Sequence, residues 1–96
     1  MNEDICRIIG VELSKRVRGY VNISIRTDIQ DGHDYVVAVV NFGSYHWKWW
    51  YKEKPVYDYF NDGGTVDRMV DEIVNKYRGW LNYTCVTKVF FKEAVA

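Results

Sequence analysis

The chain has 96 residues, of which 48% are hydrophobic and 17% aromatic, and this composition excludes an intrinsically disordered protein. One domain spanning residues 1–96, with a core of its own, is expected at this length. The 13 basic and 13 acidic side chains cancel to a formal net charge of +0, which argues against binding to duplex DNA or to a membrane surface.

An amphipathic helix is predicted from Asp4 to Arg18, because apolar residues recur there at helical spacing. Acidic residues at its start suit the positive end of the helix dipole, and Gly19 is expected to terminate the helix. The apolar stripe of this helix comprises Ile5, Ile8, Ile9, Leu13 and Val17.

Three strands of an antiparallel meander are predicted next. Residues Tyr20 to Thr27 alternate between apolar and polar, as expected of a half-buried strand. The Asp31-Gly32 turn leads into a second strand, Asp34 to Phe42, which is apolar on both faces. The Gly43-Ser44 turn then leads into an aromatic third strand, Tyr45 to Lys52.

A second helix and a fourth strand are predicted to complete the fold. Val56 to Gly64 is interpreted as a loop, and Thr65 as the N-cap of a helix that Gly79 ends. Residues Tyr83 to Phe91 are β-branched and aromatic, which favours a strand. The predicted fold class is α+β: a two-layer sandwich in the order α-β-β-β-α-β, with an antiparallel meander sheet and two helices on one face. The residues expected to share its core are Ile5, Ile9, Leu13, Ile23, Ile25, Val70, Ile73 and Val74.

The central strand leaves one apolar face without a predicted cover, because only one of its faces can meet the helices. The residues that look outward are either Tyr35, Val37 and Val39, or Val36, Ala38 and Val40. The 53–64 loop, a second copy of the chain or a partner protein is expected to cover that face.

No residue pattern typical of catalysis or of metal binding is found in the sequence. His33 and His46 have no serine or cysteine nucleophile signature around them. Cys6 and Cys85 lie far apart and lack the paired spacing of a zinc site. A protein without enzymatic activity and without a cofactor is therefore predicted. A cytoplasmic location is also predicted, because no apolar stretch has the length of a transmembrane helix and the acidic start is unlike a signal peptide.

The two faces of the aromatic strand differ in chemistry. Its alternating residues form one set of Tyr45, Trp47, Trp49 and Tyr51 and another of His46, Lys48, Trp50 and Lys52. The first set is interpreted as core beneath the helices. The second set is a basic strip around a single tryptophan, which indicates a binding surface.

A protein partner is the leading hypothesis for this surface, because an aromatic centre with a basic rim is typical of protein interfaces. The candidate binding residues are Trp50, Lys48, Lys52, His46, Arg26, Tyr57, Tyr59 and Phe60. The layout resembles that of some anti-CRISPR inhibitors, which also have a helix–meander–helix arrangement. This resemblance implies a small phage or mobile-element protein that inhibits a host protein. A homodimer that pairs through the same face, with no catalytic activity, is an alternative.

Single-stranded nucleic acid is the other alternative partner. Trp50 would stack on a base, while Lys48 and Lys52 would contact its phosphate. Double-stranded RNA is not expected, although the α-β-β-β-α order resembles that of double-stranded RNA-binding domains. The second helix of those domains begins with basic residues that grip phosphates, whereas this one begins with Thr65–Glu72, which is largely acidic.

Overall fold

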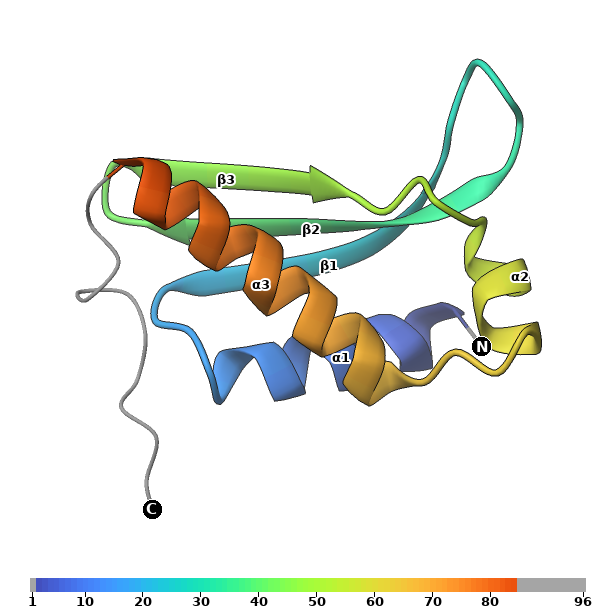
Figure 1. Cartoon of the computed structure of the whole chain (residues 1–96), viewed down its shortest axis with the longest axis horizontal. Coiled ribbons are helices and arrows are strands. Elements are labelled where there is room, and N and C mark those ends of the chain that lie inside the picture. The colour runs from blue at the N-terminus through green and yellow to red at the C-terminus, as the bar shows by residue number, and fades with distance from the viewer. Residues whose placement is uncertain (1, 85–96) are drawn as a thin grey trace.

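The computed structural model describes residues 2–84, in which six elements follow one another in the order α-β-β-β-α-α (Figure 1). The elements are α1 (Asn2–Ser14), β1 (Tyr20–Thr27), β2 (Asp34–Phe42), β3 (Tyr45–Trp50), α2 (Val56–Asn61) and α3 (Val66–Thr84). The strands form one antiparallel sheet in the order β1-β2-β3. The predicted α+β class and the three-stranded meander are therefore confirmed.

One face of the sheet packs against α1 and α3, which lie on the same side of it (Figure 1). β2 turns Val36, Ala38 and Val40 toward these helices, which decides the orientation of the central strand. Of the residues expected in the core, five are buried: Ile9, Leu13, Val70, Ile73 and Val74. The other three, Ile5, Ile23 and Ile25, are partly buried and pack against that core.

A continuous row of aromatic rings ties β3 to the helices. This aromatic row runs from Trp80 and Tyr77 on α3, through Trp47, Trp49 and Tyr51, to Tyr59 and Phe60 on α2. The centroids of successive rings lie between 5.1 and 6.5 Å apart, within the range of favourable ring contacts. Burial raises the pKa of Tyr51 to about 12, with a further contribution from the nearby Glu72, so its hydroxyl stays neutral at physiological pH.

Helix α1 ends at Ser14, four residues before the predicted end at Arg18. The Ser14 hydroxyl donates to the carbonyl of Val11 at 2.7 Å, a bond that competes with the helical pattern at the last turn. Val17 then leaves the helix and is buried in the core. Gly19 follows with a φ of 105°, and a β-carbon there would collide with the carbonyl oxygen of Asn41. Gly19 therefore does not terminate the helix. It allows the segment between α1 and β1 to pass close to the Asn41 carbonyl of β2.

The segment predicted as a loop contains the short helix α2, which was not expected. Pro55 precedes its first turn, where a missing N–H costs nothing, and the Tyr59 N–H donates to the Pro55 carbonyl at 2.9 Å. Val56 and Tyr59 are buried in the core beside the helices. A helix of six residues is too short to show an apolar period, so packing rather than sequence pattern defines it.

Helix α3 begins as predicted but does not end at Gly79. The Thr65 hydroxyl accepts a hydrogen bond from the Arg68 N–H at 3.2 Å, which confirms the N-cap. The helix continues to Thr84 because Leu81 is fully buried and the Trp80 ring stacks on Tyr77, and this packing outweighs the cost of a helical glycine, about 1 kcal/mol. The first two residues of the predicted fourth strand are therefore helical, and the rest of it lies outside the described residues. None of the helices within residues 2–84 has both the length and the hydropathy needed to cross a membrane.

Truncation of Ile73 tests the two-layer core. Its side chain is fully buried between α3 and the sheet, so Ile73→Ala should lower the free energy of unfolding by about 2–5 kcal/mol. Urea denaturation followed by tryptophan fluorescence measures this loss. Ile29→Ala is the matched control, because Ile29 is 100% exposed and its truncation should leave the midpoint unchanged. Equal midpoints for the two variants would contradict the packing described here.

Candidate binding surface

The side of the sheet opposite α1 and α3 carries a second set of alternating side chains, here called the outer sheet face. It comprises Tyr20, Asn22, Ser24 and Arg26 of β1, Tyr35, Val37, Val39 and Asn41 of β2, His46, Lys48 and Trp50 of β3, and Lys52 just beyond β3. The strand register sets these residues in rows across the sheet, so that Val37 lies between Ser24 and Trp50, and Val39 lies between Asn22 and Lys48. Five of the predicted binding residues therefore share one surface: Arg26 of β1, His46, Lys48 and Trp50 of β3, and Lys52 just beyond it.

Trp50 is held between two lysines on this face. The Lys48 Nζ lies 5.6 Å from the centroid of the Trp50 ring, and the Lys52 Nζ lies 5.1 Å from it. Both distances are within the range of cation–π attraction, which contributes about 0.5–1 kcal/mol at an exposed site. The ring is half-buried, with these two ammonium groups over it and Val37 as its partner on β2.

The outward residues of β2 are shielded by their neighbours on the same face. Val37 is 0% exposed and Tyr35 is 6% exposed, although neither belongs to the core between sheet and helices. Trp50 is the cross-strand partner of Val37, and the apolar stems of the lysines flank that ring. The face that lacked a predicted cover is thus closed at its centre by its own side chains. Two aromatic residues of the 53–64 segment, Tyr59 and Phe60, instead pack on the helical side, and Tyr57 is exposed.

An ion pair fixes one end of the outer sheet face. Lys52 donates to Asp28, which is buried just after β1, and the Gln30 N–H donates to the same side chain at 2.7 Å. The bond from Lys52 is the main cause, and that from Gln30 the next, of a lowered pKa of the Asp28 carboxyl. Next to it the Tyr35 hydroxyl donates to Asp31 at 2.5 Å, and this bond is the main reason that the pKa of Tyr35 is raised to about 12.

The remaining cations of this face are uncommitted. Within residues 2–84, Arg26 makes no ion pair, and Lys48 makes only its contact with the Trp50 ring. No carboxylate occupies any of the positions that define the outer sheet face, since Asp28 lies beyond the end of β1. At the opposite end, the His46 Nδ1 lies 2.5 Å from the Asn41 Oδ1. The face therefore presents positive charge around one aromatic ring.

The three predicted binding residues of α2 lie apart from this surface. Tyr59 is buried, with its ring centroid 5.3 Å from that of Tyr51 in the aromatic row. Tyr57 is exposed and Phe60 is half-buried, and both line a cavity at the end of the sheet. The predicted residues are thus divided between two surfaces and the core.

The structure also adds residues that the sequence reasoning did not select. Tyr20 is 68% exposed and stands in one row with Asn41 and His46, and Val39 is half-buried beside Lys48. The alternation within β1 puts Tyr20 on the same face as Asn22 and Ser24, but its neighbours on other strands depend on the register between strands. Sequence alternation alone supplies the face of each strand and leaves the alignment open.

Neither a metal centre nor a relative assigns a function to this surface. Among the residues that the structure describes, no group of three or more His, Cys, Asp or Glu side chains is placed to hold a metal ion. Comparisons with protein-family models, with curated proteins and with solved structures find no match to the chain. The function must therefore be argued from the chemistry of the surface itself.

Acidification tests the contact between Asp28 and Lys52. Because the pKa of Asp28 is lowered on folding, its carboxylate stabilises the fold above the ordinary aspartate pKa of about 3.9. This contribution is lost as the pH falls through the lower folded-state pKa. Asp28→Asn should therefore lose less stability than the wild type on acidification, as measured by urea midpoints at a series of pH values. Lys52→Ala should show the same reduced sensitivity, and variants that match the wild type at every pH would refute the contact.

Proposed function

We propose that this chain is a small, non-enzymatic protein-binding module whose outer sheet face binds an acidic surface of a partner protein. The observation that carries the proposal is the half-buried Trp50 ring between two lysine side chains. A large ring in a partly desolvated setting is the usual anchor of a protein interface, and the cations around it select a partner of opposite charge.

The uncommitted cations support a charged rather than a purely apolar partner. Arg26 and Lys48 lie on different edge strands, one on each side of β2, so a partner that spans the sheet would meet both. Carboxylates on that partner would form charge-assisted hydrogen bonds with them. The exposed ring of Tyr20 adds an amphipathic contact at the end of the face near His46.

A pair of copies joined face to face is less favoured by the same charges. A two-fold dimer brings the same patch of both copies together, and this patch carries Arg26 and Lys48, neither of which has an ion-pair partner within residues 2–84. Val37, the apolar residue that such a dimer would need at its centre, is already fully buried within one chain. An acidic partner removes the repulsion that a second copy would create.

Single-stranded nucleic acid is the second candidate, because phosphates would also neutralise these cations. Base stacking needs an open ring face, whereas two ammonium groups stand over the Trp50 ring and would have to move. The protein partner requires no such displacement. An inhibitor that covers an acidic site on a host protein, as phages and mobile elements encode, is the specific form of the proposal that the helix–meander–helix layout suggests.

Charge reversal at Lys48 tests the protein-binding proposal. Tagged wild type, Lys48→Glu and Trp50→Ala are used to capture partners from a lysate, and the affinity of each captured protein is then measured. Trp50→Ala should reduce partner affinity by about 2 kcal/mol or more. Lys48→Glu should also reduce it, and should lower the free energy of unfolding by no more than about 1 kcal/mol, the size of the lost cation–π contact. Lys15→Glu, just beyond the end of α1 in the opposite layer, is the control and should bind as the wild type does. A partner that all four proteins bind equally would exclude the outer sheet face.

An oligonucleotide titration separates the two candidate functions. We expect no saturable change in tryptophan fluorescence with single-stranded DNA or RNA at about 150 mM salt, where weak phosphate contacts are screened. Saturation at submicromolar concentration, abolished in Trp50→Ala and made less salt-dependent in Lys48→Ala, would replace the protein-binding proposal with the nucleic-acid one.

A further inference from the structure

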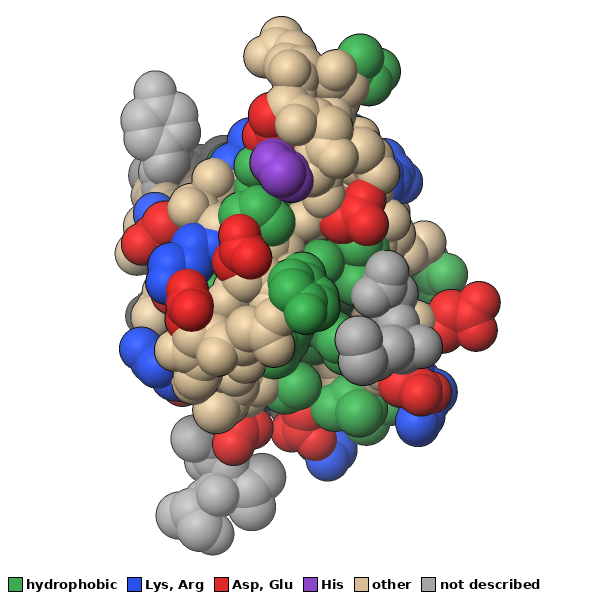
Figure 2. Space-filling view, turned by 90° about the vertical axis from the view of Figure 1, so that its right-hand side faces the viewer, with side chains coloured by type: hydrophobic (Ala, Val, Ile, Leu, Met, Phe, Trp, Pro, Cys, Tyr) green, Lys and Arg blue, Asp and Glu red, His purple; other side chains and the backbone are tan. Residues whose placement is uncertain are grey.

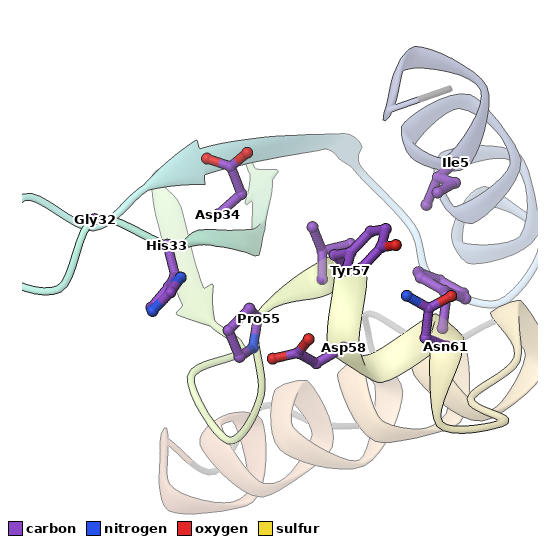
Figure 3. Close-up of a pocket in the computed structure, with 10 residues that line it drawn as sticks. Ile5, Gly32, His33, Asp34, Pro55, Tyr57, Asp58 and Asn61 are labelled. Atoms are coloured by element: carbon purple, nitrogen blue, oxygen red, sulfur yellow. The ribbon is translucent and has the colours of Figure 1, made fainter.

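A cavity of about 610 Å³ opens at the end of the molecule where the β1–β2 turn, α1 and α2 meet, away from the outer sheet face. Figure 3 shows Tyr57 and Asp58 on α2, with His33 and Asp34 of the strand hairpin on one side and Ile5 of α1 on the other. Its volume is within the range of about 300–1,000 Å³ that is usual for small-ligand sites. The cavity is therefore large enough for a small organic molecule.

The lining of the cavity is mixed, because five of its ten residues are apolar and the others are polar or glycine. Ile5, Pro55, Val56, Tyr57 and Phe60 supply the apolar part. Figure 2, which looks at this side of the molecule, shows hydrophobic side chains gathered at the centre and acidic side chains around them. Apolar walls with a small number of polar groups that fix orientation are the usual composition of a ligand site.

The charges at this cavity are negative. Asp34 and Asp58 line it, and no lysine or arginine is among the lining residues. The nearest basic residue along the chain, Lys54, is turned to Asp62, with 2.9 Å between the Nζ and the carboxylate oxygen. Asp58 also acts at a distance, because it is among the charges that raise the pKa of Tyr35, after the larger effect of the hydrogen bond to Asp31. An anionic ligand would thus be repelled here.

The two aspartates differ in their hydrogen bonds. Asp34 accepts a hydrogen bond from the Thr27 hydroxyl. The Asp58 carboxylate makes no hydrogen bond and no ion pair with any residue in the described range 2–84, and the neighbouring Asn61 amide makes no hydrogen bond within that range either. Tyr57, which is 68% exposed, lines the same cavity; its ring points toward the side of Asn61, and the Asp58 carboxylate points toward the side of Pro55 (Figure 3). A carboxylate and an aromatic ring that line one cavity are two groups that attract an organic cation.

We propose that this cavity binds a small organic cation, a primary amine attached to an aromatic or alkyl body. The apolar body lies against Ile5, Val56 and Phe60, and the ammonium group pairs with the Asp58 carboxylate, while the Tyr57 ring lines the same cavity. This site is independent of the proposed protein-binding surface, since it shares no residue with the outer sheet face.

Three probes of the same shape and different charge test the site. 2-Phenylethylamine, 2-phenylethanol and phenylacetate are titrated into the ¹⁵N-labelled chain, and the amide shifts of residues 32–34 and 56–61 are followed. The amine should produce saturable shifts in both segments, the neutral alcohol should bind several-fold more weakly, and the anion should produce none. Equal affinities for amine and anion, shifts confined to other residues, or no saturation by the amine would each overturn the proposal.

Two variants assign the contacts and one serves as control. Asp58→Asn should weaken binding of the amine roughly fivefold and leave the alcohol unaffected, because the variant removes only the charge. Tyr57→Ala should weaken both probes. Asp67→Asn, an exposed change in the first turn of α3, should bind like the wild type. Lys48→Glu should do so as well, which separates a failure of this site from a failure of the protein-binding proposal. An Asp58→Asn variant with unchanged amine affinity and a wild-type spectrum would refute the assignment.

Discussion

The aromatic row is the interaction on which the arrangement of layers depends. β3 is an edge strand with one neighbour, β2, and its inward rings are what attach it to α3 through the contact of Trp47 with Tyr77, and to α2 through the contact of Tyr51 with Tyr59. Each buried ring removes a large apolar area from water and also gains from ring–ring geometry. The same contacts draw α2 to the helical side and carry α3 past Gly79, because Trp80 stacks on Tyr77.

The outward side of β3 differs in chemistry from the inward side that attaches it to the helices. Trp50 alternates with the inward rings and so stands on the outer sheet face, where lysines instead of helices surround it. In the described part of the chain, residues 2–84, the helices pack on the other side of the sheet, and the lysine stems shield the Trp50 ring only in part. The result is a stable but incompletely buried aromatic centre, which suits association with another molecule.

The neutral sum of charges conceals a separation between two surfaces. Cations gather on the outer sheet face, around Arg26 and Lys48, while carboxylates gather at the cavity, around Asp34 and Asp58. The two lysines that follow β3 are already paired, Lys52 with Asp28 and Lys54 with Asp62. Because neither neutralises Asp34 or Asp58, the end of the molecule with the cavity stays negative. A count over the whole chain cannot report such a division, because local potential depends on distance.

The sequence by itself determined the three strands, the two amphipathic helices and the two-sided character of β3, since these follow from periods of 2 and 3.6 residues within one segment. Only the tertiary structure decided that Val36 rather than Val37 faces the helices, that residues 56–61 form a helix, and that Tyr57 joins His33 at a cavity. β2 is apolar on both sides, and α2 is too short for a pattern, so neither carries a local signal. Their placement was settled by contacts between segments distant in sequence, which no single stretch of residues encodes.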